Sequence, residues 1–127
     1  MKIYFLPFVF LVALNSFSQK WQPIDEKIMS RWAKKVTPAN VWQEYPRPQF
    51  ERSLWKNLNG IWDYTILKSN QPKPKSFEGK ILVPFSFESA LSGVGKSITP
   101  EDKMWYRKKF SIPSEWKGKR ILVNFEA

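Results

Sequence analysis

The stretch of residues 44–67 constrains the fold more than any other part of the chain. A proline-rich arm, residues 45–48, leads through a short turn to the pair Asn59-Gly60, which precedes the aromatic and β-branched run of residues 61–67. An Asn-Gly pair before such a run is a strong signal of a turn followed by a strand. The chain must therefore contain a sheet that covers the aromatic side chains of this stretch.

This first strand alternates between two kinds of side chain. Large apolar residues recur at every second position, and the positions between them are polar. Because successive side chains of a strand point to opposite faces, this pattern predicts a strand with one buried side. We expect Trp62, Tyr64 and Ile66 to face the core, with Asp63 and Thr65 on the other face.

Further strand signals follow along the chain. Residues 80–84 form a short apolar run that ends at a proline, which predicts a buried strand that stops there. Residues 104–112 and 120–126 alternate again, and the segments 85–96 and 113–119 between the strands are rich in turn residues. Several short strands separated by turns predict an all-β fold, an antiparallel β-sandwich.

The alternation assigns faces to the two later strands. The inward positions are Tyr106, Phe110 and Ile112 in the third strand and Ile121, Val123 and Phe125 in the fourth. Lys108 shares the inward parity of Tyr106. A lysine at such a position marks a sheet edge, a bulge or a paired charge.

The N-terminus resembles an export signal. Met1-Lys2 supplies a positive start, residues 3–14 are almost wholly apolar, and Ser16 and Ser18 are small residues ahead of Gln19. An apolar run of this length matches the ~7–15 residues of a secretory signal core and falls short of the ~20 that span a bilayer. We expect residues 1–18 to be a signal peptide and the mature protein to be periplasmic or secreted. The alternative is an N-terminal buried strand or helix.

Residues 19–50 are expected to form a helix followed by a proline-rich arm. Within residues 25–36 the apolar side chains of Ile28, Trp32 and Val36 fall on one face of a helix, and Thr37-Pro38 would end it. The arm that follows is extended because of its prolines.

The composition excludes several kinds of chemistry. The chain contains no cysteine and no histidine, so disulfides, thiol catalysis, Ser-His-Asp catalysis and His or Cys metal sites are excluded. A metal would need oxygen ligands, and the carboxylates show no calcium-loop spacing. We therefore expect no metal site and no cofactor.

The charge balance is basic, with a formal net charge of +10. Such a balance brings nucleic acids and acidic glycans into consideration as partners. The lysines and arginines are spread along the whole chain, which favours a solvated surface over a specific anion site. A nucleic-acid partner is not expected, because the aromatic side chains face inward and the leader directs the protein outward.

Four motifs in a fixed order point to a family. They are Arg47-Pro48 with Arg52 and WKNLNGIWDY at residues 55–64; ILVPFSFES at residues 81–89; MWYRKKF at residues 104–110; and Pro113, Trp116, Gly118 and Lys119 with ILVNFEA at residues 121–127. Together, over residues 45–127, they resemble the N-terminal sugar-binding domain of glycoside hydrolase family 2, the family of β-galactosidases and β-glucuronidases. Each motif is weak alone, and the specificity lies in their order.

The resemblance implies a fold and a reaction. The family's first domain is a jelly-roll-like, galactose-binding-domain-like β-sandwich, which precedes an immunoglobulin-like domain and a catalytic (β/α)8 barrel. Retaining glycosidases hydrolyse O-glycosyl bonds with two carboxyls ~5–5.5 Å apart, and in this family both are glutamates on the barrel. No glutamate of this chain matches either catalytic motif, so we assign no catalytic residue here.

The resemblance also suggests where a sugar would bind. In galactosidases of this family the loop after the "VP" strand reaches the active site, and here that loop contains Ser86, Phe87 and Glu88. Ser86 lies about where some members carry an asparagine. Ser86 and Glu88 could hydrogen-bond sugar hydroxyls, and Phe85 or Phe87 could stack on a sugar face. Alternatively, both phenylalanines belong to the core and Glu88 is solvated.

These observations favour one function. We expect residues 51–127 to be an incomplete sugar-binding sandwich, and the chain to be the N-terminal fragment of an exported glycosidase of β-galactosidase type. Its partners would be a β-galactoside or related glycan and the remaining domains of the parent enzyme, with no stable membrane association after signal cleavage. The alternative is a stand-alone, non-catalytic carbohydrate-binding module.

Overall fold

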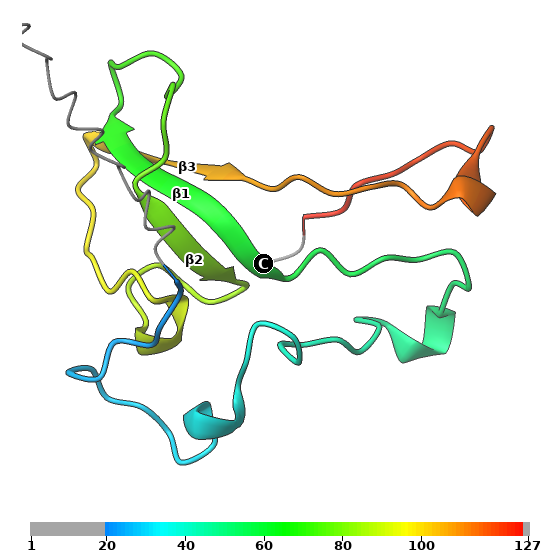
Figure 1. The fold of residues 1–127 in the computed structure, drawn as a ribbon, viewed down its shortest axis with the longest axis horizontal. Coiled ribbons are helices and arrows are strands. Elements are labelled where there is room, and N and C mark those ends of the chain that lie inside the picture. The colour runs from blue at the N-terminus through cyan, green and yellow to red at the C-terminus, as the bar shows by residue number, and fades with distance from the viewer. Residues whose placement is uncertain (1–19, 126–127) are drawn as a thin grey trace, which may run out of the picture.

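The structure, a computed structural model, describes residues 20–125. The predicted signal peptide, residues 1–18, lies outside this range and stays a prediction. Within the described range the strands form one antiparallel sheet, with β1 (Gly60–Lys68) between β2 (Gly79–Val83) and β3 (Asp102–Arg107) (Figure 1). No helix of the described residues is long and apolar enough to cross a membrane.

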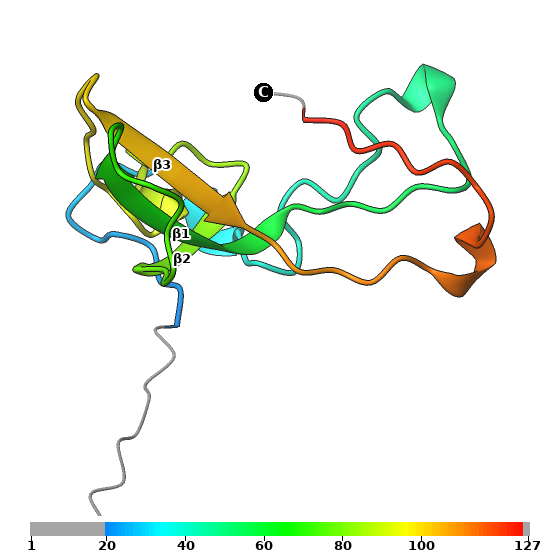
Figure 2. The same ribbon diagram turned by 90° about the horizontal axis from the view of Figure 1, so that it is seen from above.

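The rest of the described chain wraps around the sheet or projects from it. Four single turns of 3-10 helix interrupt the loops: η1 (Ala33–Lys35), η2 (Pro48–Phe50), η3 (Ala90–Ser92) and η4 (Ser114–Trp116). Residues 51–59 and 108–125 project from the sheet on the same side, where residues 108–113 run outward to η4 and the chain after η4 turns back (Figures 1 and 2). The ammonium of Lys56 joins them by donating to the Ser111 carbonyl at 2.8 Å.

The first two predicted strands are confirmed. β1 covers the aromatic run, and β2 ends at Val83, directly before a proline that follows a cis peptide bond. Proline cannot donate to a strand neighbour, so pairing stops where it enters. The glycine of the Asn-Gly pair is itself the first residue of β1, with a φ of 103° that disfavours residues with a side chain.

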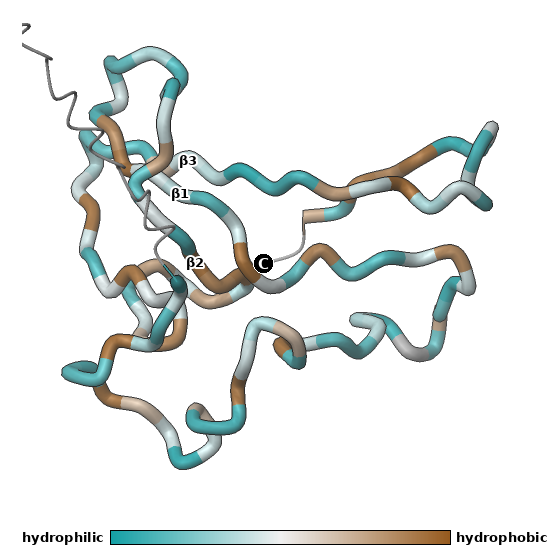
Figure 3. Tube along the Cα trace, viewed as in Figure 1, coloured by the Kyte–Doolittle hydropathy of each residue, from teal (hydrophilic) through white to brown (hydrophobic). Residues whose placement is uncertain are grey.

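The core lies on the face that the alternation predicts. Tyr64, Ile81 and Val94 are buried together, and five partly buried side chains pack against them: Trp62, Ile66, Val83, Phe87 and Met104. The register explains this grouping, because Trp62 is the direct partner of Ile81 and Ile66 that of Met104. In Figure 3, one of the brown, hydrophobic stretches of the trace lies along β2.

The opposite face of the sheet is also covered. Ile81 and Leu82 are neighbours in β2, so their side chains point to opposite faces, yet both are 0 % exposed. Thr65, expected on the polar side of β1, is buried at 7 % exposure. Both faces of β2 are therefore buried at these two residues, in agreement with the buried strand that the apolar run of residues 80–84 predicts.

The helix predicted over residues 25–36 is wrong. Only η1 forms there, and Ile28, on the predicted apolar face, is 103 % exposed. Contacts distant in sequence fix the chain at the start of the segment: the Trp21 indole donates to the Leu91 and Ser92 carbonyls at 3.2 and 3.1 Å, the Ile24 amide donates to the Ala90 carbonyl at 3.0 Å, and the Lys27 ammonium donates to the Glu88 carbonyl at 2.7 Å. An isolated helix of about a dozen residues is marginal, so these tertiary bonds prevail.

The two later strands also differ from the prediction. β3 ends at Arg107, and residues 120–125 form no strand. Tyr106, Phe110 and Ile112, expected inside, are 42 %, 45 % and 53 % exposed. Alternation can indicate a strand, but a strand also needs a neighbour for its backbone groups, and the described residues provide none for these segments. The structure therefore contains a small antiparallel β fold with a single sheet among residues 20–125.

Two asparagines attach the proline-rich arm to the start of β1. The side-chain amides of Asn57 and Asn59 both donate to the carbonyl of Trp42, at 2.6 and 3.1 Å. Trp42 has a φ of 45°, which is uncommon for a bulky residue. The amides therefore hold the backbone of the arm in a bend that an aromatic residue seldom adopts.

Candidate functional site

The loop that the resemblance assigns to sugar binding begins directly after β2. Its first turn is closed by the Phe85 amide, which donates to the Leu82 carbonyl at 3.2 Å. Phe87 packs against the core cluster. Ser86 and Glu88 are exposed, and the Glu88 carbonyl accepts a bond from the Lys27 ammonium at 2.7 Å. The three residues therefore do not share one surface, because Phe87 points into the core.

A buried serine organises the same loop. Ser92 is 0 % exposed, and its hydroxyl bonds the Phe87 and Ser89 carbonyls at 3.1 and 2.8 Å. The same oxygen accepts from the Val94 amide at 3.0 Å. This role is structural, and the sequence carried no signal for it beyond a small polar residue next to a glycine.

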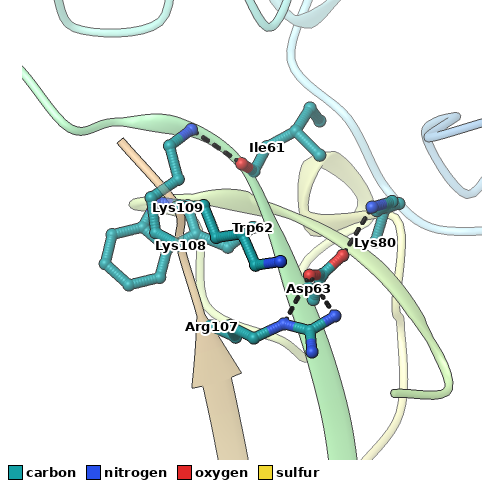
Figure 4. Close-up of a pocket in the computed structure, with 7 residues that line it drawn as sticks. All are labelled: Ile61, Trp62, Asp63, Lys80, Arg107, Lys108 and Lys109. Atoms are coloured by element: carbon teal, nitrogen blue, oxygen red, sulfur yellow. Dashed lines mark hydrogen bonds and ion pairs between the residues drawn. The ribbon is translucent and has the colours of Figure 1, made fainter. Parts of the chain in front are cut away.

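A second cluster lies where the three strands meet the projecting segments. An open pocket of about 210 Å³ is formed there by residues of β1, β2 and the end of β3 (Figure 4). It is lined by Ile61, Trp62, Asp63, Lys80, Arg107, Lys108 and Lys109. Four of these side chains are cationic and one is a carboxylate, so the lining carries a net charge of 4 − 1 = +3.

Strand pairing places one carboxylate between two cations. Asp63 on β1 is the direct partner of Lys80 on β2 and of Arg107 on β3. The Lys80 ammonium lies 2.5 Å from Oδ1 of Asp63, and Nη2 of Arg107 lies 2.8 Å from Oδ2. The bond from Lys80, supported by that from Arg107, holds the pKa of Asp63 below its usual value, although burial acts against it.

The two lysines that follow β3 complete the pocket. The ammonium of Lys108 donates to the carbonyl of Ile61 at 2.8 Å, which attaches the end of β3 to the start of β1 (Figure 4). Burial lowers the pKa of Lys108, because a half-buried ammonium loses part of its hydration. The inward parity of Lys108 therefore reflects a charge bonded to backbone at the end of a strand.

A third group of charges covers the other edge of the core. The ammonium of Lys96 pairs with the carboxylate of Glu78, which also accepts a bond from the Tyr64 hydroxyl at 3.5 Å. Burial raises the pKa of Tyr64, and the nearby Glu78 charge adds to this effect. This group closes the core around Tyr64.

Sequence reasoning identified the components of the basic pocket without assembling them. The alternation places Asp63 away from the core and marks Lys108 as an unusual inward charge, but the spread of lysines and arginines along the chain predicts a solvated surface. The missing signal was the register, because Lys80 and Arg107 reach Asp63 only through strand pairing.

Residues 20–125 contain no group of three or more His, Cys, Asp or Glu side chains that could hold a metal ion. The cationic lining of the basic pocket suits recognition of a negatively charged group by ammonium and guanidinium donors. The comparisons add no family: no protein-family model matches the chain, and no curated protein matches it significantly.

Proposed function

We propose that the chain is the N-terminal part of an exported family 2 glycoside hydrolase of β-galactosidase type. It carries the sugar-binding domain of that enzyme and none of its catalytic carboxylates. In this proposal hydrolysis takes place on a barrel domain of the parent enzyme, and the present domain supports the barrel and forms part of the wall of its sugar pocket.

One observation supports the proposal most directly. The first motif runs into β1, the second contains most of β2, and the third contains most of β3. Three matches that are separate in sequence thus correspond to three adjacent strands of one sheet. Unrelated chance matches would have no reason to pair with one another.

A jelly-roll-like sandwich is the larger architecture that we propose. The segment 108–125 carries exposed apolar side chains, namely Phe110, Ile112, Leu122, Val123 and Phe125. A second sheet would give these side chains a partner and remove their contact with water.

The proposal includes an address and a partner. Residues 1–18 act as the export signal, so the protein works in the periplasm or outside the cell, without stable membrane association. The partner is a β-galactoside or related glycan. Ser86 and Glu88 are the exposed residues of the loop that approaches it, while Phe87 contributes packing.

The reading frame beyond the codon of Ala127 tests this proposal. We expect it to continue through an immunoglobulin-like domain into a barrel with two glutamates, and its full product to cleave a nitrophenyl β-galactoside. A frame that ends or continues into unrelated sequence contradicts the proposal. In that case, the chain alone is titrated with galactosides and its tryptophan fluorescence is measured. Binding with a millimolar or lower Kd would indicate a stand-alone module.

A further inference from the structure

We infer that the basic pocket around Asp63 binds an acidic sugar unit through the carboxylate or sulfate oxygens of that unit. The inference rests on the proposed function, because it specifies the kind of glycan that a sugar-binding domain of this charge would select. It concerns a different place from the loop after β2, since the pocket is formed by the sheet itself and by the residues that follow β3.

Asp63 already compensates part of the positive charge of the pocket. Asp63 uses one carboxylate oxygen for Lys80 and the other for Arg107. It therefore holds these two cations in place but can neutralise only one of them. The guanidinium of Arg107 is further fixed by the Phe77 ring, whose centroid lies 4.0 Å away.

Two cations of the pocket remain. Lys108 bonds a neutral acceptor, the Ile61 carbonyl, so its charge has no opposite charge to pair with in that bond. Lys109 lines the same pocket and has no hydrogen-bond or ion-pair partner among residues 20–125. Lys108 is half-buried and has no counter-charge in that bond, which makes its ammonium costly to desolvate, whereas Lys109 is exposed. An anion seated beside both lysines would offset the cost at Lys108.

The volume of the pocket limits the size of the ligand. The pocket has a volume of about 210 Å³, below the roughly 300–1,000 Å³ of sites for drug-sized ligands. It therefore suits a single sugar unit better than an extended strand. Ile61 and Trp62 give it an apolar part, and the combination of an apolar wall with a few fixed polar groups is typical of small-molecule sites.

A nucleic acid is the less favoured occupant. Proteins that bind single strands combine a basic groove with aromatic rings on which the bases stack. Here Trp62 is the one aromatic residue among those that line the pocket, so successive bases would find no second ring to stack on. The cationic charge that Asp63 leaves unneutralised lies within one pocket, and this fits a single acidic group.

The test is a calorimetric titration of the full chain at about 0.05 and 0.2 M salt. Surface charges are screened more strongly at the higher of these two concentrations. The probes are a galacturonate oligosaccharide, a sulfated galactan oligosaccharide, a neutral galactan of equal length and a single-stranded oligonucleotide of matched charge. The two acidic sugars distinguish carboxylate from sulfate as the recognised group. We expect at least one of them to bind more tightly than the neutral sugar and the oligonucleotide.

Variants locate the binding. K108Q/K109Q is expected to lower the affinity for the acidic sugar by about tenfold, the effect of losing one or two charge-assisted hydrogen bonds. K34Q/K35Q removes the same charge from η1 and is expected to leave the affinity within about twofold. Because Lys108 also bonds backbone, K109Q alone and the charge-preserving K108R serve as variants that spare that contact.

Each other outcome contradicts the inference in a recognisable way. If K108Q/K109Q and K34Q/K35Q lowered the affinity for the acidic sugar equally, the binding would reflect general charge attraction, and the assignment to the pocket would be overturned. Equal binding of neutral and acidic sugars would overturn the inference and leave the proposed sugar-binding function standing. Preference for the oligonucleotide, or no sugar binding at either salt concentration, would overturn the inference, and the downstream reading frame would still decide the proposed function separately.

Discussion

Asp63 and Arg107 are direct partners across β1 and β3, and two nitrogens of the arginine, Nη2 and Nε, lie 2.8 and 2.9 Å from the same carboxylate oxygen. The pairing joins the strand of the first motif to the strand of the third. It also leaves the second carboxylate oxygen for Lys80, so one acidic side chain ties all three strands together.

This arrangement predicts that D63N destabilises the fold. The substitution keeps the shape of the side chain but leaves Lys80 and Arg107 without a counter-charge. The Arg107 side chain is 45 % exposed, so solvent screens the loss and we expect about 1 kcal/mol in the free energy of unfolding. Urea unfolding measures it, with K73Q in the exposed loop after β1 as a control that should show no change. An unchanged D63N midpoint would contradict the pairing.

A pH dependence follows from Asp102. The hydrogen bond from Lys68, at 2.6 Å, and those from the Thr99 amide and hydroxyl lower the pKa of Asp102 to about 2. Because the unfolded carboxyl has a pKa of about 3.9, its contribution to stability is complete above that value and is lost as the pH falls through about 2. Unfolding midpoints of wild type and D102N should therefore differ above pH ~4 and converge towards pH ~2. If the difference between the two midpoints did not change with pH, the Lys68–Asp102 pair would not be the origin of the pH dependence.

Glycine at position 60 is a second point of sensitivity. Its φ is 103°, and a Cβ there would lie 3.1 Å from the Pro38 carbonyl oxygen. We expect G60A to destabilise the protein by ~2 kcal/mol or more, because backbone strain adds to a contact with main chain. Gly118 has a φ of 78° with open space around it, so G118A reports the strain alone, ~1 kcal/mol. Thermal unfolding compares them, and equal losses would remove the Pro38 contact from the explanation.

The core predicts a large effect at Ile81. This side chain is 0 % exposed within the cluster of Tyr64 and Val94, and I81A should cost ~2–5 kcal/mol through lost burial and an unfilled cavity. Ile28 is 103 % exposed, so the same change there, I28A, should stay within ~0.5 kcal/mol. Denaturant unfolding distinguishes the two. If I28A lost as much unfolding free energy as I81A is expected to lose, Ile28 would be buried, as in the predicted helix over residues 25–36.

The proposed function predicts a kinetic signature in the full reading frame. Ser86 and Glu88 are the exposed residues of the loop after β2, so S86A and E88Q should raise KM for a nitrophenyl β-galactoside about threefold to tenfold, as expected for a lost hydrogen bond. Because the proposal places the reacting carboxylates on the barrel domain, kcat should stay near the wild-type value. A fall in kcat without a change in KM would assign these residues to the chemical step.

The parts of the fold that depend on neighbours along the chain could be predicted from the amino-acid pattern. The alternation of residues 61–67 predicted β1 and the face that Trp62, Tyr64 and Ile66 present to the core, and the proline after Val83 predicted the end of β2. Both are local effects, since side-chain parity and the missing proline donor act within a few residues.

The features that join distant segments depend on contacts that no local pattern records. The bonds of Trp21 to the loop after β2 replaced the helix expected over residues 25–36. The absence of a neighbouring strand within residues 20–125 left residues 120–125 extended and unpaired. The basic pocket formed because strand register brought Lys80 and Arg107 to Asp63. Register depends on which strands pair and how they are aligned, and a pattern within one segment carries no record of its partner.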